Sequence, residues 1–254
     1  MLTRRQLFHT GLVTGCGVCA ATVTSRLFAA SAIDAPSNID GPGYSLSFVG
    51  SQRQTILTGD RAAHLDLLTL KDRPHLYGIG PIQGMTGEVT IADSRPSLAR
   101  VGADHLVHVQ ESFKAGSPFF VWAEVPAWQT QDVPELSTYA DVERFVGQAG
   151  AKVGLTQAFP FVMTGRPELV DFHIVNATPD TPPGMEAHQK IQIPFELRGR
   201  DVKLVGFWSS QHQGVFTPMG TNIHTHFQTL DNKVSGHVQG LKLGQGMTLS
   251  FPKG

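Results

Sequence analysis

The sequence predicts an α+β fold in which strands dominate, the sheets are mixed or antiparallel, and the helices are few and short. Runs rich in β-branched and aromatic residues recur along the chain and are separated by clusters of Gly, Pro, Asn and Asp, the pattern of successive strands and turns. Helical spacing of apolar residues occurs in only two segments, residues 62–70 and 141–150. This balance of elements indicates the α+β class. We expect one domain over residues 44–254, made of two closely packed halves that divide near residues 150–158.

Residues 1–32 have the pattern of a twin-arginine signal peptide. Arg4 and Arg5 precede a modestly apolar stretch over residues 11–24, and small residues near the end of the segment suit cleavage by signal peptidase. We therefore expect export to the periplasm or the medium through the Tat machinery, with no membrane anchor after processing. Two alternatives are a cytoplasmic N-terminal helix and a lipoprotein cleavage box at residues 13–16, which leaves little apolar sequence after the arginines.

Loss of this segment would change the composition of the mature chain. The whole sequence has 20 Lys and Arg against 21 Asp and Glu, and residues 1–32 contain three arginines and no acidic residue, which leaves a formal charge of −4. A net negative charge argues against nucleic acid or an anionic membrane as the partner. Both cysteines, Cys16 and Cys19, leave with the signal, so we expect neither disulfides nor cysteine metal ligands.

The mature chain is expected to begin with a linker over residues 33–43, which are rich in Pro, Gly, Asp and Asn. The first helical segment follows a Gly-Asp pair, and the second follows a Ser-Thr pair that can cap it. Residues 176–184 contain three prolines and are expected to form a loop. The expected strands cover residues 44–49, 87–93, 105–110, 119–125, 159–163, 170–175, 192–197, 203–208 and 247–251.

A β-hairpin is predicted over residues 220–243, where two strand-forming segments flank Asp231-Asn232. Both turn residues tolerate left-handed backbone angles and suit a two-residue connection. With that connection, His226 lies directly opposite His237. His224 is two residues before His226 and therefore points to the same face.

Imidazoles at these three positions lie within reach of a single ion. Three histidines with a fourth position open are a ligand set of catalytic zinc, so the hairpin predicts Zn2+ held by His224, His226 and His237. One alternative is a solvent-exposed histidine cluster on a polar strand face, and a bulge or a three-residue loop would break the register. Imidazole also suits other divalent ions, so three histidines alone do not identify the metal.

Several short motifs occur in an order that resembles one enzyme family. They are Gly78-Ile79-Gly80, Gly84-Met85-Thr86-Gly87-Glu88, Leu204-Val205-Gly206-Phe207, and His224-Thr225-His226 with His237 eleven residues further on. Over residues 46–243 the chain resembles bacterial α-acetolactate decarboxylase. The resemblance implies a fold of two α+β halves and a zinc enzyme that removes carbon dioxide from 2-acetolactate to give acetoin. It also implies that the three hairpin histidines hold the zinc and that Glu88 lies near it and takes part in catalysis.

The resemblance also sets expectations for partners and chemistry. The substrate would be a small 2-hydroxy-3-keto acid. The resemblance is also compatible with a homodimer. A metal with open positions can hold two oxygens of such an acid and stabilise the charge left when carbon dioxide departs. Glu88 would relay the proton that the product then needs. Without the resemblance, Glu88 would be interpreted as a solvated carboxylate in a turn before a strand.

Two departures from the family pattern concern the surroundings of the metal. The family carries a functional arginine on a central strand, where this chain has His173 or Val175, and Arg166 lies beside a proline in the expected turn. The family also has an acidic residue near its C-terminus, whereas this chain has no Asp or Glu after Asp231. An arginine would normally hold the substrate carboxylate. Alternative functions are therefore an exported zinc-binding homologue with an altered substrate or no turnover, and a metal-assisted lyase for another keto acid.

The remaining histidines are expected to have other roles. His212 lies in a loop that approaches the hairpin, where a surface position is favoured over a pocket position. His105 and His108 are three apart on an expected strand and so face opposite sides. His64 and His188 are expected at the surface. The sequence contains no phosphate-binding Gly-Lys-Ser/Thr loop, dinucleotide fingerprint or Gly-x-Ser-x-Gly elbow.

Overall fold

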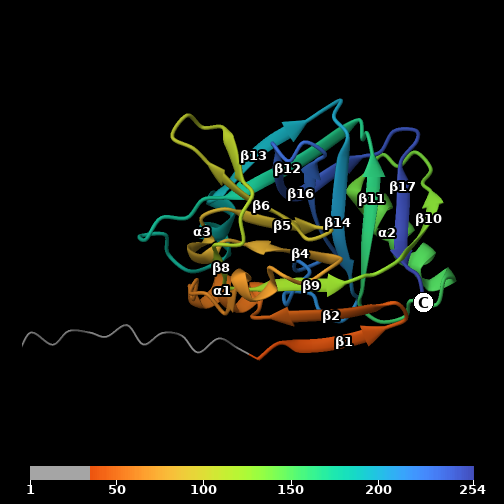
Figure 1. Cartoon of the computed structure of the whole chain (residues 1–254). Coiled ribbons are helices and arrows are strands. Elements are labelled where there is room, and N and C mark those ends of the chain that lie inside the picture. Colours follow the sequence, from red (N-terminus) through yellow and green to blue (C-terminus); the bar gives the residue numbers. More distant parts are fainter. Residues whose placement is uncertain (1–34) are drawn as a thin grey trace, which may run out of the picture. The chain divides into compact units, whose positions relative to one another are not determined.

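Two large antiparallel sheets make up most of the structure, a computed structural model that describes residues 35–254 (Figure 1). The predicted signal peptide lies outside the described residues. Strands dominate and the helices are short, which confirms the α+β class. Among the described residues, no helix is long and apolar enough to cross a membrane.

The first sheet is formed by the N-terminal part of the described chain and has the strand order β1-β2-β9-β4-β5-β6-β7. Its neighbouring strands pair antiparallel throughout. The strands are β1 (Ser37–Gly41), β2 (Tyr44–Val49), β4 (Leu76–Pro81), β5 (Glu88–Ala92), β6 (Arg95–Val101), β7 (Val107–Gln110) and β9 (Phe120–Glu124). Two further short strands, β3 (Leu65–Asp66) and β8 (Gly116–Ser117), pair with each other.

The second sheet contains the predicted metal hairpin and has the order β10-β17-β11-β14-β15-β16-β12-β13. It is also antiparallel throughout. Its strands are β10 (Trp128–Asp132), β11 (Phe159–Gly165), β12 (Leu169–Val175), β13 (Gln192–Leu197), β14 (Val202–Trp208), β15 (Ile223–Thr229), β16 (Ser235–Lys242) and β17 (Thr248–Pro252). The hairpin strands β15 and β16 therefore lie inside the sheet and not at its edge.

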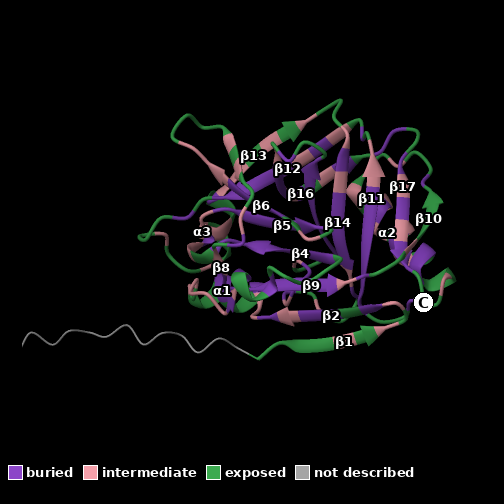
Figure 2. Cartoon of the chain, in the orientation of Figure 1, coloured by how far each residue is buried: buried purple, intermediate pink, exposed green. Residues whose placement is uncertain are grey.

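The two sheets pack face to face, and in Figure 1 their strands cross steeply. The largest apolar cluster contains residues of both sheets, among them Ile79, Val121, Phe161 and Leu204. Burial is greatest along the inner strands, whereas the edge strands β1 and β10 are largely exposed (Figure 2). Every residue of β15 is buried, so side chains on the face of β15 that meets β5 are excluded from bulk water.

The main helix, α2 (Tyr139–Lys152), packs against the second sheet. Thr138 caps its N-terminus as the sequence predicts, since its side chain accepts a hydrogen bond from the Asp141 amide. Gly147 and Gly150 lie against Trp208 and Phe159, where an added Cβ would come within 2.8 and 2.5 Å of the aromatic rings. The small side chains therefore allow the helix to approach the sheet closely.

The first predicted helix is wrong in position. Residues 62–70 contain β3 and a 3-10 turn, η1 (Leu67–Leu70), whereas the helix α1 (Gln52–Thr58) precedes Gly59. Ser51 caps α1, and Gly59 ends it with a φ of 74°. Gly59 is therefore a C-terminal cap and does not start a helix.

Two further expectations are corrected. The predicted linker over residues 33–43 contains β1, which pairs with β2. The strand predicted from residue 105 begins at Val107, since His105 has a φ of 62°. The chain passes from the first sheet to the second between β9 and β10, and the division into two halves near residues 150–158 stays a prediction. A short helix that the sequence did not indicate, α3 (Met185–Lys190), follows the proline-rich loop.

Candidate metal centre

The predicted hairpin is present, and its register is confirmed: His226 lies opposite His237. The connection is longer than the predicted two residues. The Thr229 amide donates to the Val234 carbonyl at 2.9 Å, and residues 230–233 form the turn. Because the additional residues are divided equally between the two arms, the pairing beyond the turn is unchanged.

The three hairpin histidines converge on one point. Nε2 of His224 lies 3.1 Å from Nε2 of His226 and 3.1 Å from Nδ1 of His237. One ligand atom from each of the three lies within 4.8 Å of the other two. Tetrahedral zinc with Zn–N bonds of 2.0–2.1 Å separates its nitrogens by about 3.3 Å. The imidazoles are thus spaced as ligands of one ion.

Hydrogen bonds behind the rings fix their orientation. The Nδ1–H of His224 donates to the Phe216 carbonyl at 2.7 Å, which leaves a lone pair on Nε2. The lone pair on Nε2 of His224 therefore faces one nitrogen of His226 and one nitrogen of His237. A cation placed among these three nitrogens would satisfy all three. Nδ1 of His226 lies 3.3 Å from the Thr90 hydroxyl, which in turn accepts a hydrogen bond from Ser235 at 2.9 Å. Such outer partners orient metal-binding histidines.

Burial keeps these imidazoles neutral, the form in which they bind metals. Desolvation lowers the pKa of His224 to about 4. Desolvation, followed by the proximity of His224, lowers the pKa of His226 well below its ordinary value. The pKa of His237 is also well below its ordinary value, first because of desolvation and then because of neighbouring imidazoles. The donor set therefore fits a divalent cation that favours nitrogen ligands.

Glu88, the predicted catalytic carboxylate, lies next to these imidazoles. It is the first residue of β5 and is only 2% exposed. Its Oε2 lies 3.8 Å from Nε2 of His226, and its Oε1 accepts a hydrogen bond from the Val175 amide at 3.2 Å. Burial raises the pKa of Glu88 well above its ordinary value, and the Val175 amide opposes this shift. A carboxyl group in this environment can hold a proton that a solvated carboxylate would release.

His173 is a fourth imidazole at the site. It pairs with His237 across β12 and β16, so His173, His237 and His226 form one row over three neighbouring strands. The rings of His173 and His237 stack with centroids 4.4 Å apart. Nε2 of His173 lies 4.0 Å from Oε1 of Glu88, and desolvation lowers the pKa of His173 to about 4. A second possible metal-binding group accordingly contains Glu88, His173 and His237.

The residues around the site differ from those that the family resemblance led us to expect. His173 is buried at the site, as is Val175, whose amide contacts Glu88. Arg166 is exposed and pairs with Asp201 at 2.7 Å, which agrees with its expected place in a turn. Neither arginine nor lysine occurs among the described residues that line the pocket.

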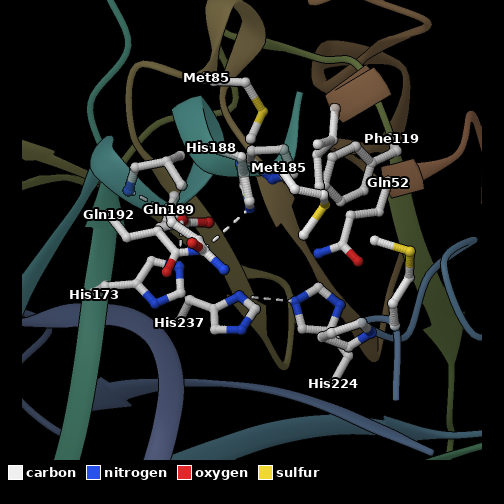
Figure 3. A pocket seen from close by; sticks show the side chains of 16 residues that line it. Gln52, Met85, Phe119, His173, Met185, His188, Gln189, Gln192, His224 and His237 are labelled. Carbon is white, nitrogen blue, oxygen red and sulfur yellow. Dashed lines mark hydrogen bonds and ion pairs between the residues drawn. The ribbon is translucent and has the colours of Figure 1, made fainter. Parts of the chain in front are cut away.

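Three of these imidazoles, those of His173, His224 and His237, lie at the floor of a cavity of about 200 Å³ (Figure 3). In Figure 3, His173, His237 and His224 lie in a row beneath side chains from α1, α3 and the loop that contains Met85. The lining residues are Gln52, Ile56, Pro81, Met85, Glu88, Phe119, His173, Val175, Met185, His188, Gln189, Gln192, Pro218, Met219, His224 and His237. The cavity is therefore lined by apolar side chains and carboxamides above imidazoles that could hold a metal.

Two of the other histidines differ in their relation to the pocket. His188 was expected at the surface, but it lines the cavity, where desolvation and then Arg61 lower its pKa to about 4. The sequence offered no signal for it, because α3 has no buried residue and hence no apolar periodicity. His212 lies outside the cavity lining and stacks on Phe216 with ring centroids 4.7 Å apart.

One family model matches most of the chain, and two solved structures share its fold. The family model described as alpha-acetolactate decarboxylase matches residues 52–252. The structure is similar to that of a Staphylococcus aureus protein described as similar to alpha-acetolactate decarboxylase, with a TM-score of 0.66, 17% identity, and coverage of 81% of this chain and 84% of that one. It is also similar to alpha-acetolactate decarboxylase from Bacillus subtilis strain 168, with a TM-score of 0.62, 18% identity, and coverage of 82% and 85%. No curated protein matches the chain in sequence.

Proposed function

The chain belongs to the alpha-acetolactate decarboxylase family, and from this premise we propose that it is a zinc-dependent carboxy-lyase that converts 2-acetolactate to acetoin and carbon dioxide. The observation that carries the proposal is the placement of Glu88 beside the three hairpin imidazoles. Its Oε2 lies 3.8 Å from Nε2 of His226, and Glu88 itself lines the cavity. A metal-binding group and a carboxyl that can hold a proton are the two components that this decarboxylation needs.

The proposed metal ligands are His224, His226 and His237. The bound cation would supply a Lewis acid for the negative charge that develops when carbon dioxide leaves. The buried imidazoles remain neutral and keep their lone pairs directed at one point. The hydrogen bond of His224 with the Phe216 carbonyl and the contact of His226 with Thr90 hold the two rings in place.

Glu88 is the proposed proton donor. In the reaction, the bond between the carboxylate carbon and the hydroxyl-bearing carbon breaks, and the electron pair spreads to the neighbouring ketone oxygen as carbon dioxide leaves. Glu88 then gives its proton to carbon, which completes acetoin, and recovers a proton from water. Burial raises the pKa of this carboxyl in the metal-free site, which favours its protonated form. The Val175 amide orients it from behind.

We also propose that the protein acts outside the cytoplasm. The twin arginines and the apolar segment of residues 1–32 support export by the Tat route followed by cleavage. A zinc site without cysteine ligands is compatible with an oxidising compartment, because the proposed histidine ligands are not oxidised to disulfides.

A second candidate function is metal binding with an altered substrate or without turnover. The observation that favours it is the cavity lining, which contains no arginine or lysine among the described residues and includes His173 and Val175, one of which stands where the family pattern would have an arginine. The identities of 17% and 18% to the structural neighbours show a shared fold and leave the substrate open.

A direct assay separates the two functions. Acetoin formed from racemic 2-acetolactate would be followed by proton NMR with the zinc-loaded protein, the chelator-treated protein and no protein. The proposed lyase produces acetoin faster than the spontaneous reaction, and chelation removes the excess. Zinc binding without any acceleration would instead support the second candidate.

A further inference from the structure

Gln52 is a buried polar residue that the proposed mechanism does not use. It lines the cavity, yet it is only 7% exposed. Its backbone is fixed, since its amide donates to the Val215 carbonyl at 2.9 Å and the Arg53 amide donates to the Gly214 carbonyl at 2.7 Å. Its side-chain carboxamide has no hydrogen-bond partner among the described residues, and it borders the cavity, where a bound molecule can reach it. A carboxamide offers two N–H donors and a carbonyl acceptor.

The other two carboxamides of the lining differ from Gln52 in this respect. Nε2 of Gln192 lies 3.1 Å from Nε2 of His188, so this carboxamide already has a partner. Gln189 is exposed on α3, where water can satisfy it. Gln52 therefore remains as the buried carboxamide that is available to a bound molecule.

Gln52 is placed where it can contact one end of a small molecule bound in the cavity. In Figure 3, Gln52 lies above the right end of the row formed by His173, His237 and His224, and His173 lies at the left end of that row. Glu88 is on the His173 side, with 4.0 Å between its Oε1 and Nε2 of His173. A molecule bound above the imidazoles thus has the proton donor on one side and a neutral hydrogen-bond donor on the other.

We propose that Gln52 binds the substrate and that its Nε2–H donates to the carboxylate of the 2-hydroxy-3-keto acid. This inference rests on the proposed function. No cationic side chain lines the cavity, so apart from the proposed metal a carboxylate here can be received only by neutral donors, and hydrogen bonds to ionised groups are among the stronger ones. The small branches of the acid then pack against apolar neighbours such as Met85 and Phe119. The site accordingly takes hydroxy-keto acids with a single carboxylate and rejects those with a second charge.

The test compares Gln52→Leu and Gln52→Glu with the matched control Gln54→Leu. Gln54 lies on the same helix but is exposed and outside the cavity lining. Calorimetry on the zinc-loaded protein would measure binding of 2,3-dihydroxy-2-methylbutanoate, in which the ketone of 2-acetolactate is reduced so that carbon dioxide cannot leave. Metal content and the thermal unfolding temperature of each variant would show that the fold and the metal site remain.

Gln52→Leu is expected to weaken binding of this acid at least tenfold, and Gln52→Glu to weaken it further by repulsion between carboxylates. Gln54→Leu is expected to bind as the unchanged protein does. Unchanged affinity in Gln52→Leu would overturn the role of Gln52, even if the protein makes acetoin. Loss of affinity in Gln52→Leu without acetoin formation by the unchanged protein would uphold Gln52 as a carboxylate-binding residue while the proposed lyase activity fails. Absence of binding to the unchanged protein would overturn the role of Gln52, while the acetoin assay decides the lyase activity separately.

Discussion

The imidazole of His226 lies directly opposite that of His237 on the paired strands β15 and β16, with ring centroids 5.0 Å apart. Side chains alternate between the two faces of a strand, so a slip by one residue would turn one of these rings away from the other. The metal centre therefore depends on a single register, and the groups that fix this register are as necessary as the ligands.

Asn232 is one of these groups. It occupies the turn with a φ of 57°, accepts a hydrogen bond from the Ser97 hydroxyl on β6, and donates to Glu111 at 3.1 Å. Asn232→Ala should lower the free energy of unfolding by about 2–3 kcal/mol, because Ser97 loses one of its two buried acceptors and alanine tolerates left-handed angles poorly. Urea unfolding of the metal-free protein measures this change. Leu230→Ala, at an exposed position in the same turn, is the control and should have little effect.

Thr90 should affect metal affinity without being a ligand. Its hydroxyl lies 3.3 Å from Nδ1 of His226 and accepts a hydrogen bond from Ser235. Thr90→Val preserves the shape and removes the hydroxyl, so zinc should bind roughly tenfold more weakly, as for other outer partners of metal-binding histidines. Competition with a chromogenic chelator measures the affinity. Thr130→Val, on the exposed edge strand β10, should bind zinc normally; an equal loss in both variants would contradict the specific role of Thr90.

Glu88→Gln separates catalysis from metal binding. The amide occupies nearly the same volume but cannot donate the proton of a carboxyl group, so the rate should fall by roughly 10²- to 10⁴-fold. Zinc content should remain that of the unchanged protein, because the three imidazoles are intact. Rate measurements and metal analysis on the same preparation test this pair of outcomes. Normal turnover in Glu88→Gln would remove Glu88 from the mechanism.

The metal-free protein should lose stability as the pH falls from about 6.5 to about 4. In this range the histidines of the unfolded chain take up protons, whereas His173 and His224 stay neutral because burial lowers their pKa values to about 4. The unfolded state then binds more protons, so the free energy of unfolding decreases as the pH falls. Glu88 has a raised pKa, so above pH 4.5 its protonation increases the free energy of unfolding as the pH falls. Several buried imidazoles act in the other direction, so their effect is the larger one.

Urea unfolding at pH 5 and pH 7 in the presence of a chelator measures this dependence. His173→Gln removes one of the responsible imidazoles and should reduce the difference between the two pH values. Stability that is equal at both pH values would show that the imidazoles titrate alike in the folded and unfolded states.

The convergence of the hairpin histidines was predictable from the sequence, because pairing across a hairpin is local. Asp231-Asn232 marks the turn, and its true length did not matter, since the two arms lengthen equally. The pairing of His173 with His237 was not predictable. It joins strands distant in the sequence, and the register of β12 and β16 shifts between Asp171 and Phe172.

The upper part of the cavity was missed because two short helices were not recognised. The sequence around Ser51 and Gly59 contains both caps of α1, but Gly59 was interpreted as preceding a helix. The helix α3 presents no buried residue from which a period could be read. Gln52 and His188 belong to these helices, so their positions in the pocket follow only from the tertiary packing.

The most direct test of the metal centre is elemental analysis of the purified protein alongside His226→Ala. The geometry predicts about one divalent cation, zinc by our proposal, per unchanged chain and little in the variant, because tetrahedral zinc needs all three imidazoles. Acetoin formation should disappear with the metal. A protein that retains no cation after loading with zinc, or a His226→Ala variant that retains as much as the unchanged chain, would contradict the assignment of His224, His226 and His237 as the ligands.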